Sequence, residues 1–475
     1  MELILIPLVL SISSFLISKE NHRLYGLLGS LFPAFLALMH FSNYESGTIV
    51  SVFSQDCFMP LGITFAMEYD GIGLLMILLT AFSIPLIFLA NFQNDTASNA
   101  KLTSMIFLMQ AGLFGVFLAA DGILFYIFWE FTLIPVFLII YWFGNATKQT
   151  LLKFFIYTLL GSLAMLMSLI WIKQYSPSFY YYDLMFATLS SKQAFWIMAG
   201  FMLAFAIKIP LFPFHTWQPD TYAGSPMSGT MLLSALMLKM ALFGMIRWMI
   251  PLAPEGLECM QTIVIGLGII GILYGGTIAI KENNVKKVFA YASISHLGLI
   301  AAGIILFTQS SIQASLIQII NHSILSIALF LVAEVLITRF NTTDLSHMGG
   351  GAQKAPKLAF WYMVVMLASV SVPFSAGFIG EFLLLREIAN YKLILGAIAA
   401  LTLVLGAVYM IRAYQLPMSG HKPDLVIKDL AWNEWAVFLI LGVLVLVFGL
   451  APHLITDMIK ESVEQIMLMS KIQLN

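Results

Sequence analysis

The sequence predicts an all-α polytopic membrane protein of about fourteen transmembrane helices, because apolar residues dominate, charged residues are scarce and two apolar runs are interrupted by proline and glycine. Of its 475 residues, 60% are hydrophobic and 10% are charged, and the mean hydropathy is +0.93. Soluble globular proteins carry about 25% charged residues. We therefore expect a lipid bilayer, and no nucleic acid, as the surroundings of this chain.

Apolar runs long enough to cross a bilayer, about 17–25 residues each, divide the chain into fourteen predicted spans. They are residues 3–18, 24–41, 71–91, 102–120, 121–143, 150–173, 193–222, 227–250, 260–280, 285–306, 312–337, 357–385, 391–415 and 433–453. The first run follows Glu2 instead of a basic segment, which favours a retained helix over a signal peptide. Residues 42–68 are too polar to span, and we expect an ordered loop with room for short strands.

The distribution of lysine and arginine predicts the orientation. Loops after odd-numbered spans carry fourteen basic residues, whereas loops after even-numbered spans and the C-terminal tail carry seven. Basic residues concentrate on the cytoplasmic side of membrane proteins. We therefore expect both termini on the outer side.

Two groups of five spans have matching interruptions. The first group, residues 102–250, contains Pro210 in KIPLFPFHTWQPDTYAGSP, and the second, residues 260–415, contains Pro373, Gly377 and Gly380 in SVSVPFSAGFIGEF. Because five is odd, the second group is upside down relative to the first, which is typical of the half-channels of secondary transporters. Coincidental proline kinks are the alternative. The remaining parts are residues 1–101, with three spans, and residues 416–475, with the last span and a tail.

Three ionisable residues of the first group lie at bilayer depth, where charge is costly and usually functional. Glu130 is roughly 14 Å into its span and Lys208 directly precedes the first proline break. Burial disfavours the charged form of each, so each would hold the other charged if they met, either as a switch or as a static ion pair. Lys239 lies about 18 Å from either end of its span without a nearby acid, so it is a candidate proton carrier.

The second group adds His296, His322 and Glu381. Histidine titrates near neutrality and passes a proton through either ring nitrogen, although a lone histidine is as often a hydrogen-bonded core residue. Two histidines in adjacent spans, near Ser293 and Asn321, favour a relay. Glu381 follows the second break, at the place that Lys208 occupies in the first group. The six residues together predict a lateral proton path.

No redox or nucleotide site is visible in the sequence. The two cysteines, Cys57 and Cys259, are too few for an iron–sulfur or structural zinc site, and a disulfide between them is possible but unsupported. There is no GxGxxG after a strand and no Walker A motif. The chain itself is therefore predicted to hold no cofactor and no metal.

Several stretches strongly resemble the antiporter-like membrane subunits of respiratory complex I, the proton-pumping NADH:quinone oxidoreductase. They are FWEFTLIPVFLI, KFFIYTLLGS, KIPLFPFHTWQPDTYAGSP, LKMALFGMIRW, NNVKKVFAYASISHLG, QIINHSILSIALFLVAE, RFNTTDLSHMGG and GFIGEF, between about Asp70 and Arg412. Two features depart from the family pattern, Gln218 where leucine is usual and Phe374 where glycine is usual.

The resemblance implies a role for each residue: Glu130 and Lys208 as a control pair, Lys239 as the proton store, His296 and His322 as the relay, and Glu381 as the outlet. It implies that the other membrane-arm subunits, including the flanking antiporter-like subunits L and N, are partners, and that NADH, FMN, iron–sulfur clusters and quinone are bound elsewhere in the complex. It also implies a bacterial inner membrane. The alternative is an Mrp-type Na⁺/H⁺ antiporter subunit, against which Glu381 argues, because the corresponding Mrp antiporter protein carries lysine there.

Overall fold

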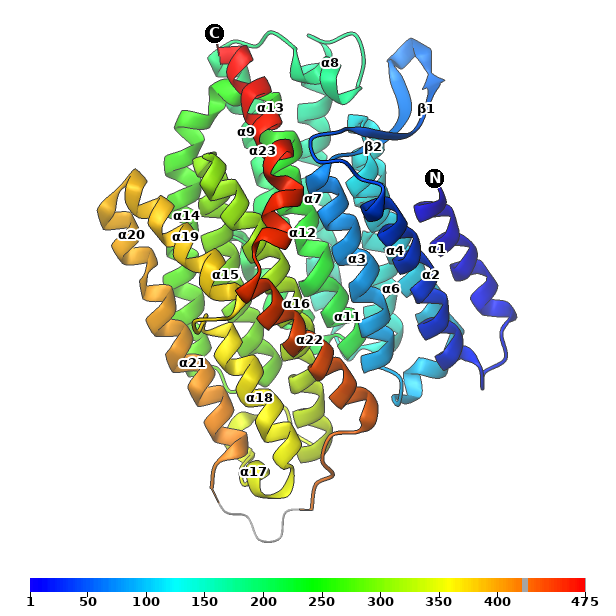
Figure 1. The fold of residues 1–475 in the computed structure, drawn as a ribbon, viewed down its shortest axis with the longest axis vertical. Helices are drawn as coiled ribbons and strands as arrows, with labels where there is room; N and C mark the ends of the chain where they lie inside the picture. The colour runs from blue at the N-terminus through cyan, green and yellow to red at the C-terminus, as the bar shows by residue number, and fades with distance from the viewer. Residues whose placement is uncertain (421–425, 475) are drawn as a thin grey trace.

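The computed structural model describes residues 1–420 and 426–474 and shows a mostly helical polytopic membrane protein (Figure 1). Eleven helices of this part of the chain are long and apolar enough to cross a membrane. The other three predicted spans correspond to the shorter apolar helix Glu2–Leu16 and to two interrupted helices described below. The predicted fold class is confirmed.

The N-terminal part holds three helices and a β-hairpin. The helices are α1 (Glu2–Ser13), α2 (His22–Ser42) and α3 (Gly71–Ala90). Between α2 and α3, the strands β1 (Val50–Phe58) and β2 (Ile63–Tyr69) pair antiparallel and project at the upper end of Figure 1. The expected ordered loop thus contains two strands.

The first five-span group begins with α4 and ends with a helix that has two π-helical stretches. Its elements are α4 (Ala100–Leu118), α5 (Gly122–Phe131), α6 (Leu133–Phe143), α7 (Lys148–Lys173), α8 (Tyr181–Met185), α9 (Ser191–Lys208), α10 (Gln218–Gly224), α11 (Met227–Met231), α12 (Leu238–Gly244) and α13 (Ile250–Leu252). The π-helical stretches, Leu232–Met237 and Met245–Met249, flank α12. Such stretches are rare and frequently occur at functional sites.

The second group runs from α14 to α21. Its elements are α14 (Leu257–Lys281), α15 (Val285–Leu306), α16 (Gln309–Phe340), α17 (Gly351–Lys354), α18 (Pro356–Ser369), α19 (Ala376–Tyr391), α20 (Leu393–Ala399) and α21 (Leu401–Met418). The interrupted helix of the first group, α9 with α10, starts near α8 at the upper end of the molecule, whereas α18 with α19 starts near α17 at the lower end (Figure 1). The two interrupted helices therefore run in opposite directions.

The junction between α4 and α5 is as tight as the sequence predicts. Asp121 caps α5 by accepting hydrogen bonds from the backbone N–H of Ile123 at 2.9 Å and of Leu124 at 3.2 Å. Its other oxygen accepts the N–H of Thr64 at 3.0 Å. A Cβ at Gly122 would lie 2.8 Å from Leu169, so only glycine fits beside the cap. The buried carboxylate thereby fixes the start of α5.

The second interruption shows backbone strain at the position where the sequence departs from its family. Phe374 has φ 75° and Ser371 has φ 56°, both in the left-handed region that favours glycine. Each such residue costs of order 1–3 kcal/mol unless its surroundings hold it in place. The Phe374 side chain is exposed, so it is the backbone of the break that is constrained here.

The C-terminal part holds the last span, α22 (Trp432–Leu450), and a further helix, α23 (His453–Leu474). The sequence predicted only a tail after the last span. Ser462 of α23 accepts the backbone N–H of Gly71, at the start of α3, at 2.9 Å, and Gln309, at the start of α16, donates to Glu464 at 2.6 Å. The helix α23 thus joins the ends of two distant spans. Residues 421–425, within the predicted part 416–475, lie outside the described residues.

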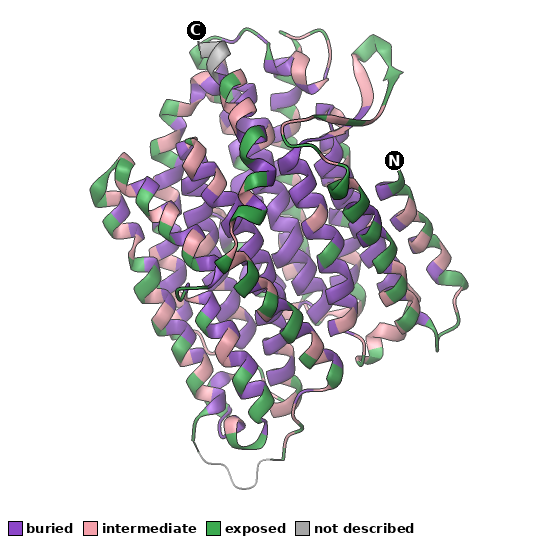
Figure 2. Ribbon diagram, viewed as in Figure 1, coloured by how far each residue is buried: buried purple, intermediate pink, exposed green. Residues whose placement is uncertain are grey.

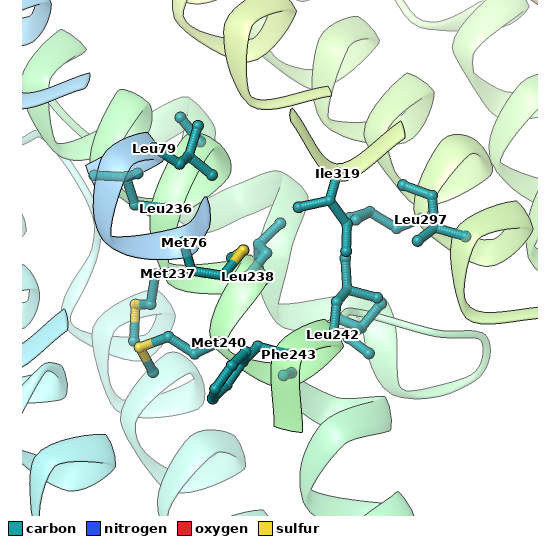
Figure 3. Packing of buried hydrophobic residues seen from close by; sticks show 14 of the residues in the cluster. Met76, Leu79, Leu236, Met237, Leu238, Met240, Leu242, Phe243, Leu297 and Ile319 are labelled. Carbon is teal, nitrogen blue, oxygen red and sulfur yellow. The ribbon is translucent and has the colours of Figure 1, made fainter. Parts of the chain in front are cut away.

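The core of the molecule is formed by α15, α16 and the segment from α11 to α13, whose residues are almost entirely buried (Figure 2). Figure 3 shows Met240 and Phe243 of this segment packed near Met76 of α3, and Leu242 facing Ile319 and Leu297. By contrast, α2, α7 and α22 expose large apolar side chains. The candidate site lies within the buried core.

Candidate functional site

Glu130 lies on the last turn of α5 and is half-buried. Its carboxylate interacts with the side chain of Ser162 on α7 and, through space, with Lys208. The half-burial shows that Glu130 faces the side of the bundle and not its centre. The depth in its span that the sequence predicts stays a prediction.

Lys208 is the last residue of α9, as the proline break predicted, and is 2% exposed. Its ammonium lies 5.2 Å from the ring centre of Trp129, the neighbour of Glu130. A cation–π contact of this kind stabilises a desolvated lysine. No ion pair joins Lys208 to Glu130 among the described residues, and the two interact only through space while the ammonium contacts Trp129.

Lys239 lies on α12 and is fully buried. Its Nζ donates to the backbone carbonyl of Ser234 at 2.5 Å and lies 2.8 Å from Nδ1 of His322 on α16. The carbonyl belongs to the π-helical stretch before α12. The side-chain partner of Lys239 is thus a histidine.

His322 is the centre of a hydroxyl network. Its Nε2 lies 3.0 Å from Oγ of Ser293, and its Nδ1 lies 3.1 Å from Oγ of Ser326. Ser234 in turn donates to Ser326 at 3.0 Å. Hydroxyls donate and accept at once, so this network can pass a proton without leaving a charge on its own members.

His296, on α15, contacts Glu381 directly. Nδ1 of His296 lies 2.6 Å from Oε1 of Glu381, and Nε2 lies 3.3 Å from the hydroxyl of Tyr409 on α21. Glu381 is 2% exposed and also accepts from Nε2 of Gln318 at 3.4 Å. A carboxylate and an imidazole at this distance can exchange a proton.

A cavity of about 30 Å³ lies between the two histidines, whose ring centres are 6.4 Å apart. Its lining includes Ser234, Ser293, His296, Gln318, Asn321 and His322. Two of the lining amide oxygens, Oε1 of Gln318 and Oδ1 of Asn321, have no hydrogen-bond partner among the described residues. A cavity of this size has room for one or two water molecules, and its polar atoms lie among apolar side chains such as Phe289, Leu325 and Met410. The structure therefore brings His322 and His296 together around one cavity, with Lys239 in contact with His322 and Glu381 in contact with His296.

The sequence missed several members of this site. Ser326 could have been found from its i+4 spacing to His322, and Gln318 from the same spacing on the other side. Tyr409 comes from a distant helix and gave no sequence signal. Of the polar neighbours expected beside the relay, Ser293 contacts His322, whereas Ser295 bonds to the carbonyl of Ile272 and to Thr402.

The described residues contain no group of three or more His, Cys, Asp or Glu side chains that could hold a metal ion. Cys57 and Cys259 are both free and exposed.

Comparison with known proteins identifies the family. Residues 119–406 match the family model described as NADH:quinone oxidoreductase/Mrp antiporter, TM. The chain is 34% identical over 417 residues to NADH-quinone oxidoreductase subunit M of Rickettsia typhi, covering 86% of this chain and 84% of that protein. The chain belongs to this antiporter-like family. Within it, subunit M of NADH-quinone oxidoreductase is the member that the chain resembles.

Solved structures of the antiporter-like family share this fold. One is a chain of respiratory complex I from Thermus thermophilus with bound NADH, with a TM-score of 0.90, 31% identity and 99% of both chains covered. Another is a chain of the Mrp complex from Dietzia sp. DQ12-45-1b, with a TM-score of 0.86 but 19% identity, covering 98% of this chain and 51% of that one. The second similarity shows the fold alone, and the matching family model is shared by NADH:quinone oxidoreductase and Mrp antiporter proteins.

Proposed function

We propose that this chain is a proton-translocating membrane-arm subunit of NADH:quinone oxidoreductase. It works in a bacterial inner membrane with both termini on the outer side, as the fourteen-to-seven distribution of basic residues favours. The observation that carries the proposal is the series of Lys239, His322, His296 and Glu381, in which Lys239 contacts His322, Glu381 contacts His296 and a cavity lies between the two histidines. Such intramembrane titratable groups are expensive and serve proton paths.

The control elements are Glu130 and Lys208. A charge change in a neighbouring subunit acts on half-buried Glu130, and Trp129 holds Lys208 close by without an ion pair. Moving Lys208 toward or away from Glu130 changes the electrostatic potential in the core. That change alters the proton affinity of Lys239.

The proton store and its outlet follow from the contacts. Lys239 gives its proton to Nδ1 of His322, which lies 2.8 Å away. From His322 the proton crosses the cavity through water to His296, and from Nδ1 of His296 it moves to Glu381 over 2.6 Å. Glu381 then releases it outward. The lysine returns to its neutral form and is ready for the next proton.

The driving redox chemistry belongs to partner subunits. NADH, FMN, iron–sulfur clusters and quinone are bound there, because this chain supplies no site for them that its sequence reveals. Exposed apolar side chains on the lateral helices, such as Leu160 and Met167 of α7 and Val404 of α21, suit contact with lipid and with the flanking subunits L and N.

The test is Lys239→Ala in the assembled complex, with quinone reduction and proton pumping measured in membrane vesicles. We expect both to fall at least about tenfold, since the proton store is lost. Lys287→Ala is the matched control, because Lys287 is partly exposed and pairs with Asp220 at 2.8 Å. Normal turnover and pumping in the Lys239 variant would contradict the proposal.

A further inference from the structure

Gln218, the first residue of α10, is fully buried. Neither its amide nitrogen nor its amide oxygen forms a hydrogen bond with any of the described residues. Burying an amide in this way costs stability unless water or a ligand satisfies it. The proton path described above does not use this side chain.

The Gln218 side chain is directed at a second buried polar group. The hydroxyl of Tyr222, one turn further along α10, interacts with the side chains of both Gln218 and Ser234. Neither interaction has the geometry of a full hydrogen bond, since the hydroxyl of Tyr222 is also without such a partner in the described part of the chain. Water that bridges these groups would satisfy their polar atoms.

From Tyr222, a series of hydrogen bonds leads to the proton store. Ser234 donates to Ser326 at 3.0 Å, and Ser326 lies 3.1 Å from Nδ1 of His322, the atom that Lys239 also contacts at 2.8 Å. The ring of Tyr222 packs 5.4 Å from that of Phe330, which lines the central cavity. Hydrogen bonds therefore continue from Ser234 to the pair of Lys239 and His322, and bridging water would join Gln218 and Tyr222 of α10 to Ser234.

We infer that Gln218, Tyr222, Ser234 and Ser326 form the branch that delivers protons to Lys239 from the half of the membrane that contains α10. Gln218 acts as a positioning residue that holds water. The hydroxyl of Tyr222 accepts one proton from that water and donates its own toward Ser234, and Ser234 and Ser326 do the same in turn. Ser326 donates its proton to Nδ1 of His322, which passes one on to the neutral amine of Lys239, and the water is protonated again from the solvent side. Each hydroxyl and the imidazole end neutral, and Lys239 gains one proton. This inference rests on the proposed function.

The experiment uses the assembled complex in membrane vesicles with Gln218→Leu and Tyr222→Phe. Both substitutions keep the side-chain volume close to the original and remove only the polar atoms. We expect both variants to assemble normally. Quinone reduction and proton pumping should fall about three- to tenfold, because the group that holds the water is lost. The solvent deuterium isotope effect on the rate should be larger than in the unsubstituted complex. A steeper loss of rate toward high pH, where protons are scarce, is expected too. Gln218→Asn should recover part of the rate.

Tyr362→Phe is the matched control for Tyr222→Phe. Tyr362 is also fully buried with a hydroxyl that lacks a partner in the described residues, and its ring faces Tyr414 at 5.2 Å, away from the central cavity. Tyr362→Phe should leave the rate of quinone reduction and its solvent isotope effect unchanged.

Unchanged rate, isotope effect and pH profile in both the Gln218 and Tyr222 variants would overturn the inference. If Gln218→Leu does not assemble, Tyr222→Phe alone decides the matter by the same readouts. Lys239→Ala distinguishes a failure of this inference from a failure of the proposed function. If Lys239→Ala is inactive while the Gln218 and Tyr222 variants are normal, only the delivery branch is wrong. If Lys239→Ala is itself normal, the proposed function fails.

Discussion

Lys239 and His322 are in direct contact, with Nζ of the lysine 2.8 Å from Nδ1 of the histidine, although 83 residues separate them in the chain. The contact joins the first five-span group to the second at the centre of the molecule. Both side chains are buried, so a proton that reaches one of them has the other as a nearby acceptor. This pair, together with the hydrogen bond from Ser234 to Ser326, therefore links the two half-channels.

Replacing His322 tests that link. His322→Leu removes the acceptor for Lys239 and leaves its Nζ with only the carbonyl of Ser234. We expect pumping-coupled quinone reduction to fall at least about tenfold, because the proton relay is broken. Ser326→Ala removes only a neighbouring hydroxyl and should cost less. Equal and small effects in both variants would show that His322 is a core residue.

Glu381 is expected to require a carboxylate. Glu381→Gln keeps the size of the side chain but cannot accept the proton from His296, so pumping should fall about tenfold or more. Glu381→Lys should fail as well, because the carboxylate 2.6 Å from Nδ1 of His296 stabilises the protonated imidazole, whereas an ammonium in its place would repel it. Retained pumping in the lysine variant would mean that any titratable group suffices.

Gly380 allows α19 to approach α16 closely. A Cβ at this position would lie 2.5 Å from Oε1 and 3.0 Å from Cβ of Gln318, the residue that contacts Glu381. We expect Gly380→Ala to lower the stability of the complex by about 1–3 kcal/mol, as overpacking does, and to lower pumping through displaced Glu381. Gly266→Ala is the control, since nothing lies within 4 Å of its added Cβ. Thermal unfolding of both variants is the measurement.

Trp129 is expected to hold Lys208 in place. Trp129→Leu removes the ring under the ammonium, a contact worth about 0.5–2 kcal/mol. Lys208 is then free to move toward Glu130, and we expect poorer coupling, that is, fewer protons pumped per NADH oxidised. Trp129→Phe keeps an aromatic face and should be milder. An unchanged number of protons pumped per NADH oxidised in Trp129→Leu would show that Trp129 is not one of the control elements.

A buried ion pair outside the proton path is expected to matter for assembly. Nη1 of Arg247 lies 2.9 Å from Oδ2 of Asp70, and the guanidinium lies 4.4 Å from the ring centre of Tyr181. Asp70→Ala leaves the arginine unpaired, which costs about 3–5 kcal/mol. The amount of assembled complex in membranes should fall accordingly. Asp70→Ala combined with Arg247→Leu should recover part of it, and no recovery would contradict this explanation.

The positions of the interrupted helices could be predicted from the sequence, because proline and glycine act locally. Lys208 ends α9, and Gly377 and Gly380 lie in α19, directly after the second break. The helix α23 could not be predicted as part of the fold, since its docking depends on contacts such as Ser462 with Gly71, which are hundreds of residues apart.

The titratable residues of the candidate site could be predicted because a charge at bilayer depth is conspicuous in a sequence. The contacts between these residues could not be predicted. The lysine of one group pairs with the histidine of the other, and Tyr409 joins from α21, because helix packing brings together residues that no sequence spacing relates. For the same reason the sequence paired Glu130 with Lys208 but could not foresee the contact of Lys208 with the ring of Trp129.

The most direct test of the proposed proton path is a structure of the intact complex at a resolution that reveals water. We predict ordered water in the cavity between His322 and His296, hydrogen-bonded to Oε1 of Gln318 and Oδ1 of Asn321, so that an unbroken hydrogen-bonded chain runs from Lys239 to Glu381. A cavity that is dry, or closed by a side chain between the two histidines, would contradict it.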